Sequence, residues 1–107
     1  MMAGSVLADV PRELQDEQIV DLLSTPNLRI ERIVSTGQSS PLGFWHDQDW
    51  AEWVLLLAGS AGLHIEGEAE PRRLAAGDYL HIGAHQRHRV AWTDPAQPTI
   101  WLAIHHR

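Results

Sequence analysis

The stretch GFWHDQDWAEWVLLLAG, Gly43–Gly59, places a group of polar side chains directly before the most apolar run of the chain, residues 53–57. A chain of this size has one modest core, so polar groups at the mouth of its most hydrophobic segment need a physical explanation. Their side chains can carry charge, form hydrogen bonds or bind a metal ion. They are His46, Asp47, Gln48, Asp49 and Glu52.

Outward from this stretch, the chain after about residue 26 carries β-strand signals in place of helix signals. Short β-like segments alternate with turn-rich separators such as AGSAG, GEAEP and TDPAQP. Closely spaced strands without helices between them form antiparallel sheets, because parallel strands need long crossover connections. We therefore expect an all-β barrel or sandwich. Its predicted strands are 28–35, 53–57, 61–66, 72–75, 79–82, 88–92 and 99–105.

The strand pattern also indicates where the polar side chains of the quoted stretch point. In an extended segment alternate residues share a face, so His46 and Gln48 point to the same side. After a brief turn, Glu52 faces inward together with Val54 and Leu56. Polar side chains are therefore expected to line the mouth of the barrel.

The residues before this β region follow a different pattern. In PRELQDEQIVDLLSTPN the apolar side chains fall on roughly one side of an acidic segment that is bounded by two prolines. This spacing predicts one short amphipathic helix. The sequence thus predicts an N-terminal helical arm over residues 1–25 and a β-barrel over residues 26–107. The apolar side of the helix would consist of Leu14, Ile19, Leu22 and Leu23.

Composition excludes several classes of function. At 107 residues the chain fits a single domain. It has eight Arg, no Lys and a formal net charge of -6, which repels phosphate backbones and anionic lipid heads, so we expect neither a nucleic acid nor a membrane as partner. Without Cys there is no disulfide and no thiolate ligand, so nitrogen and oxygen atoms must hold any metal ion.

The N-terminal sequence MMAGSVLADVPRELQ lacks the basic flank and the continuous apolar core of a signal peptide. No apolar run approaches the roughly 20 residues that a membrane-spanning helix needs. We therefore expect a cytoplasmic location.

A second cluster of polar residues lies late in the chain, in GDYLHIGAHQRHRVAW. It holds His81, His85 and His88, and the strand pattern puts His88 on the same face as Val90 and Trp92. Burying an imidazole near a carboxylate is costly unless the two groups bind one another or a cation. A bound metal ion is one explanation for both polar groups, and a hydrogen-bonded mouth for an organic ligand is another.

At these residues the sequence resembles the cupin superfamily. The first cupin motif, G(X)5HXH(X)3,4E(X)6G, finds His46 at its first histidine and Gln48 where the second histidine would be. Glu52 follows after three residues and Gly59 after six more, whereas the leading glycine is displaced.

The second cupin motif, G(X)5PXG(X)2H(X)3N, keeps its spacing but not all of its residues. Gly77 starts it and His88 takes the ligand histidine, whereas Gly83, His85 and Trp92 replace its proline, second glycine and asparagine. The segments GDYLHI, WTDP and IWLAIHH are similar to those of small, single-domain cupins of undefined function. The resemblance covers about residues 26–105.

The resemblance implies a double-stranded β-helix, a jelly-roll-like barrel of two antiparallel sheets that is often a homodimer. It also implies one divalent transition metal ion, such as Zn, Fe, Mn or Ni, held inside the barrel by His46, Gln48, Glu52 and His88. An amide oxygen is a weaker donor than an imidazole, so Gln48 should lower the affinity and loosen the selection among metals.

Three hypotheses for function stay open at this point. The first is a metal-dependent enzyme on a small polar substrate. The second is a non-catalytic module that binds or senses a small molecule, with Trp92, His81 and His85 as further ligand-binding residues. The third is a metal-free barrel whose former site has decayed. The sequence alone does not choose among them, because such barrels host many chemistries.

Overall fold

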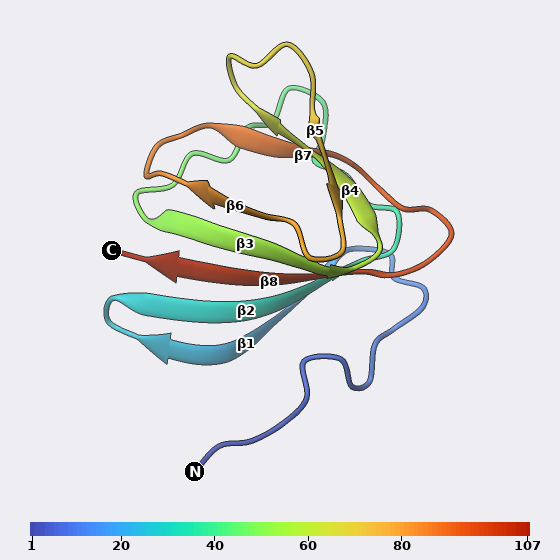
Figure 1. Cartoon of the computed structure of the whole chain (residues 1–107), viewed down its shortest axis with the longest axis vertical. Helices are drawn as coiled ribbons and strands as arrows, with labels where there is room; N and C mark the ends of the chain where they lie inside the picture. Colours follow the sequence, from blue (N-terminus) through green and yellow to red (C-terminus); the bar gives the residue numbers. More distant parts are fainter.

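Two antiparallel sheets pack against one another in the structure, a computed structural model that describes residues 1–107 (Figure 1). The larger sheet has the strand order β1-β2-β8-β3-β6, and the smaller sheet has the order β5-β4-β7. This architecture confirms the all-β prediction. The strands are β1 Gln18–Thr25, β2 Leu28–Ser35, β3 Ala51–Ala58, β4 Ser60–Ile65, β5 Arg72–Ala75, β6 Tyr79–Ile82, β7 His88–Thr93 and β8 Thr99–His106.

The strands predicted after residue 26 are all present. The bounds of β2, β5 and β6 are those that the sequence predicted, and the other four differ by one or two residues at their ends. Alternation and turn residues located them because each lies between clear breaks in the pattern.

The predicted N-terminal helix was wrong. Residues 18–25 form β1, which pairs with β2 and so lies before the boundary that we placed at residue 26. A β-bulge between Asp21 and Leu23 shifts the register. The apolar residues of this strand therefore do not alternate, and their spacing resembled that of a helix. The structure contains no helix long and apolar enough to cross a membrane.

The core lies between the two sheets and is built from the inward faces of the strands. On β3, Val54 and Leu56 are buried as alternation predicted. The turn into β4 needs Gly59, because its φ is +84° and a Cβ there would lie 2.7 Å from the Cα of Thr99. The buried cluster consists of Val54, Leu56, Ala61, Leu63, Ile65, Leu74, Ile82 and Trp101.

The segment before β1 runs along the larger sheet and brings one acid to the open end of the barrel. The buried guanidinium of Arg32 donates to the carbonyl oxygen of Ala8 at 2.6 Å and to the side chain of Gln18 at 3.0 Å. The Ser35 hydroxyl donates to Glu17 at 3.2 Å. These contacts hold Glu17 at the mouth of the cavity described next.

Candidate functional site

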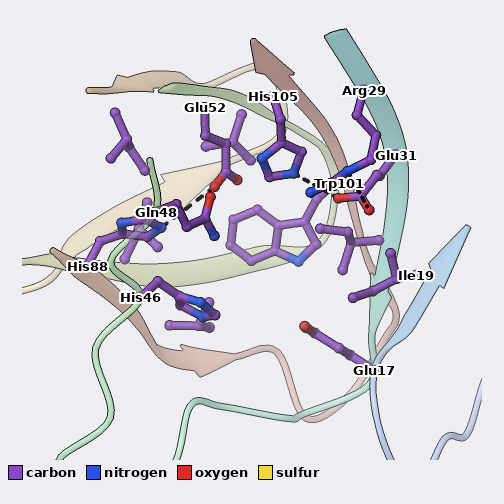
Figure 2. Close-up of a pocket in the computed structure, with 15 residues that line it drawn as sticks. Glu17, Ile19, Arg29, Glu31, His46, Gln48, Glu52, His88, Trp101 and His105 are labelled. Carbon is purple, nitrogen blue, oxygen red and sulfur yellow. Dashed lines mark hydrogen bonds and ion pairs between the residues drawn. The ribbon is translucent and has the colours of Figure 1, made fainter. Parts of the chain in front are cut away.

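A cavity of about 220 Å³ opens between the sheets and combines an apolar interior with charged and polar side chains. Its apolar wall includes Val54, Leu63 and Trp101 of the core. The polar and charged side chains come from the segment before β1, from β2, β3, β7 and β8, and from the loop before β3 (Figure 2). The polar and charged lining residues are Glu17, Arg29, Glu31, His46, Gln48, Glu52, His88 and His105.

Glu52 and His88 form a buried pair across this cavity. The Nε2 atom of His88 lies 3.6 Å from Oε1 of Glu52, and the two side chains are 7% and 12% exposed. Nδ1 of His88 lies 2.9 Å from the carbonyl oxygen of Gln86, to which it can donate, and this bond fixes the ring with Nε2 turned toward Glu52.

The pKa values of this pair follow from opposing effects. Burial by itself raises the pKa of Glu52, but its interaction with His88 and the nearby charge of His105 outweigh this effect and leave the pKa below its ordinary value. Burial by itself lowers the pKa of His88, but contact with Glu52 and the Gln86 carbonyl leaves it raised. The pair thus favours a carboxylate beside an imidazolium.

His46 and Gln48 reach the cavity from the loop before β3. The backbone of His46 exchanges two hydrogen bonds with that of His88, at 2.7 and 3.1 Å, so the two side chains lie on one face. Their rings stack with 5.3 Å between centroids. Burial, and secondarily the charge of His88, lowers the pKa of His46. The amide of Gln48 lies beside Glu52 and His88 in Figure 2.

A second buried pair, which the sequence pattern did not predict, consists of Glu31 and His105. Nε2 of His105 lies 2.8 Å from Oε1 of Glu31, and Nε of Arg29 lies 3.4 Å from the other carboxylate oxygen. Alternation along β8 could have indicated that His105 shares the inner face with Trp101. Its contact with Glu31, 74 residues away in sequence, depends on the pairing of β2 with β8.

Trp101 forms a rigid wall at the middle of the cavity. Its indole Nε1–H donates to the hydroxyl of Ser35 at 3.1 Å, and the residue is buried. Figure 2 shows the indole ring between His46 and the Glu31–His105 pair. The hydrogen bond satisfies the polar end of the ring, so its apolar part is free to contact a ligand.

The family model of the cupin domain matches residues 31–105, which include both polar groups and most of the strands. The chain belongs to the cupins. A solved structure from Ralstonia eutropha JMP134, described as a candidate mannose-6-phosphate isomerase, is 51% identical to this cupin. The similarity covers 99% of this chain and 98% of that chain, with a TM-score of 0.97.

More distant cupins share the fold alone. A cupin superfamily protein from Desulfitobacterium hafniense DCB-2 is 16% identical over 91% of this chain and 83% of its own, with a TM-score of 0.74. An RmlC-like cupin with a double-stranded β-helix fold from Methanocaldococcus jannaschii is 14% identical over 94% and 92%, with a TM-score of 0.70. The comparison with curated proteins gave no match.

The structure brings together the four residues that the resemblance implied as metal ligands. His46, Gln48, Glu52 and His88 all line the cavity described above. The three residues predicted to bind an organic ligand lie elsewhere, and none of them lines the cavity.

His81 and His85 are on the outside of the barrel. The Nε2 atom of His81 lies 3.0 Å from Nε2 of His106 on the exposed face of the larger sheet. His85 is in the loop after β6, where its φ is +60° and its Nδ1 lies 2.8 Å from a carboxylate oxygen of Asp47. Neither ring contributes to the cavity.

Trp92 faces away from the cavity because of a second β-bulge. The register of β7 against β4 shifts between Val90 and Trp92, so these two residues do not share a face as uninterrupted alternation predicts. Val90 lines the cavity, whereas Trp92 packs beside Gly62 with the guanidinium of Arg73 over its ring at 5.4 Å.

The four side chains have donor atoms that suit a divalent transition metal ion. Their present arrangement, however, is not that of a coordination site. Two imidazoles, a carboxylate and an amide face one cavity, and His88 has the backbone-anchored Nδ1 that is common in metal-binding histidines. No three His, Asp or Glu side chains stand together as they would around an ion. His46 is stacked on His88, so its ring would have to rotate to complete a three-ligand set.

Proposed function

We propose that this cupin binds one divalent transition metal ion, such as Zn, Fe, Mn or Ni, in the cavity. His46, Glu52 and His88 would be its main ligands and Gln48 a weaker fourth. The observation that carries this proposal is the buried His88–Glu52 pair, in which the ring is anchored through Nδ1 and Nε2 faces the carboxylate at 3.6 Å. Two imidazoles with one carboxylate resemble open catalytic metal sites.

We propose further that the metal-bound cupin isomerises a small polyhydroxylated substrate. The support is the 51% identity to the Ralstonia eutropha protein described as a candidate mannose-6-phosphate isomerase. An aldose–ketose conversion moves one hydrogen from C2 to C1 and one from the C2 oxygen to the C1 oxygen. The bound metal would supply Lewis acidity toward these oxygens.

Within that reaction, His105 and Glu31 are arranged to handle a proton. The Glu31 carboxylate accepts from Nε2 of His105 at 2.8 Å and so holds the ring with Nδ1 free. An imidazole oriented by a buried carboxylate is a common general base. The buried cavity around it would exclude bulk water from the bound substrate.

Elemental analysis of protein purified without chelators tests the metal site. We expect about one equivalent of metal in the wild type, none in His88→Ala and an unchanged content in the control His106→Ala, whose ring lies on the outer face. If folded His88→Ala keeps its metal, or if the wild type takes up none on titration, the metal proposal is wrong. The cavity would then be read as a polar site for an organic ligand alone.

Turnover distinguishes an enzyme from a binding module. Incubation with a panel of aldoses in D₂O, followed by NMR, should show ketose formation and deuterium incorporation in the wild type, both lost in His105→Phe. Saturable binding of the same compounds without any conversion would instead favour the non-catalytic alternative.

A further inference from the structure

The charges that line the cavity restrict the class of substrate. Glu17, Glu31 and Glu52 contribute three carboxylates, whereas Arg29 is the one guanidinium. That guanidinium lies 3.4 Å from the Glu31 carboxylate, so a phosphate would compete with this carboxylate for it. The chain has no Lys that could add another cation. Even with the proposed metal ion bound, a phosphate dianion in this cavity would face three carboxylates and a single side-chain cation, so its charge would be poorly balanced.

The other arginines near the open end already bind other groups of the protein. Arg87 pairs with Glu66 at 2.6 Å, and Arg89 donates to the carbonyl oxygen of Ser40 at 2.9 Å. Arg32 is held by the backbone of the N-terminal segment. None of these side chains lines the cavity. Apart from Arg29, no arginine or lysine lines the cavity to bind a phosphate.

His105 has a buried polar atom that a ligand could bind. The residue is 4% exposed, and its Nδ1 has no hydrogen-bond partner in the protein. In Figure 2 this nitrogen lies on the side of the ring that faces Glu52. Because Nε2–H donates to the Glu31 carboxylate, Nδ1 of the neutral ring is an acceptor, and a ligand hydroxyl could satisfy it.

The remaining surroundings suit a compound that carries several hydroxyls on a small carbon frame. Carboxylates of Glu17, Glu31 and Glu52 accept hydrogen bonds from hydroxyls, and the fixed indole of Trp101 offers an apolar surface to C–H groups. The volume of about 220 Å³ is below the roughly 300 Å³ at which pockets for drug-sized ligands begin. A monosaccharide-sized ligand is therefore the expected size class.

We infer that the substrate of this cupin is a neutral polyhydroxylated compound of monosaccharide size, a free sugar or sugar alcohol, and not a sugar phosphate. This inference rests on the proposed function for the use of the cavity as a substrate site. The inferred substrate is uncharged, whereas the Ralstonia eutropha protein is described as a candidate isomerase of a sugar phosphate.

Matched pairs of probes test the inference on the protein with the metal it carries on purification. Free hexoses and hexitols are compared with mannose 6-phosphate and glucose 6-phosphate by NMR titration at pH 7.5, following the indole N–H signal of Trp101. We expect at least one free compound to bind saturably, with its 6-phosphate bound at least about tenfold more weakly. Equal or tighter binding of the phosphates, or no binding by any free sugar or sugar alcohol, overturns the inference.

Two variants and one control test the residues on which the inference depends. His105→Phe removes the unpaired acceptor and should weaken binding of the free sugar about tenfold, as expected for one buried hydrogen bond. His106→Phe, on the outer face of the same strand, should bind like the wild type. Glu17→Gln removes one carboxylate and should narrow the difference in binding affinity between the free sugar and its phosphate. Unchanged affinity in His105→Phe and an unchanged ratio in Glu17→Gln would count against the inference.

Metal content, measured in parallel, keeps this test separate from that of the proposed function. A metal-free wild type that still prefers the neutral sugar contradicts the metal proposal alone. A metal-loaded wild type that prefers the 6-phosphate contradicts the substrate inference alone.

Discussion

Gln48 occupies the one metal-ligand position of the cupin motifs at which this sequence lacks the usual residue. Imidazole is a stronger donor than an amide for late first-row metal ions. We expect Gln48→His to tighten metal binding by about tenfold or more, because the side chain already lines the cavity beside Glu52 and His88. Competition with a chelating dye at fixed pH measures the affinity, since only neutral imidazole binds metal.

Gln97→His is the matched control for this substitution. Gln97 hydrogen-bonds to Asp94 in the loop after β7 and lies outside the cavity, so a histidine there should leave the affinity unchanged. An equal affinity in wild type and Gln48→His would show that this position does not contact the ion.

The buried Glu52–His88 pair should make the stability of the metal-free protein depend on pH. The folded pKa of Glu52 is below its ordinary value of 4.5, so its stabilisation is present above 4.5 and lost as the pH falls through the folded pKa. The folded pKa of His88 is above 6.5, so its stabilisation is complete below 6.5 and lost as the pH rises through the folded value.

The pair therefore contributes most between about pH 4.5 and 6.5. Urea unfolding of chelator-treated protein at a series of pH values measures this dependence. Glu52→Gln should lose stability most strongly within that window and less outside it. A uniform loss at every pH would mean that the charge pairing is not the cause.

At the scale of the strands, the contact between β4 and β7 requires a glycine. A Cβ on Gly62 would overlap the indole of Trp92, with Cδ1 at 2.6 Å and Cε2 at 2.8 Å. We expect Gly62→Ala to displace Trp92 and to lower the free energy of unfolding by about 1–3 kcal/mol. Urea denaturation measures the change, and the fluorescence of the displaced indole should shift.

Gly83→Ala is the control for Gly62→Ala. A Cβ on Gly83 would meet no atom closer than Oε1 of Gln86 at 3.9 Å, and its backbone does not have a positive φ. Its free energy of unfolding should stay within about 0.5 kcal/mol of the wild type. Equal effects of the two substitutions would show that contact with Trp92 does not decide the cost.

At the scale of the whole molecule, the homodimer expected from the sequence stays a prediction. The edge strand β1 leaves Ile19, Val20 and Leu23 exposed by 56%, 36% and 40%. Apolar side chains on an unpaired sheet edge are usually covered by a partner. We expect a dimer in sedimentation velocity at micromolar concentration, shifted toward monomer by Leu23→Glu.

Leu42→Glu serves as the control because Leu42 is 96% exposed in the loop between β2 and β3, away from the sheet edge. It should sediment like the wild type. A stable wild-type monomer at micromolar concentration would refute the dimer, and an effect of Leu42→Glu equal to that of Leu23→Glu would refute its location.

The sequence by itself determined the strands from residue 28 onward, the inward face of β3 and the four implied ligands that share the cavity. These features depend on local information: turn residues mark the ends of strands, and alternation assigns their faces. Motif spacing then located Glu52 and His88 on facing strands. In a regular strand successive side chains point to opposite faces, so the direction of one side chain fixes the direction of the next.

Only the tertiary structure decided the nature of β1, the outward direction of Trp92 and the pairing of Glu31 with His105. One extra residue in a bulge reverses the faces of a strand, and the bulges in β1 and β7 form where these strands pair with β2 and β4. Glu31 and His105 meet because β2 and β8, distant in sequence, are neighbours in one sheet. Such pairings depend on the packing of the whole chain, which no local pattern records.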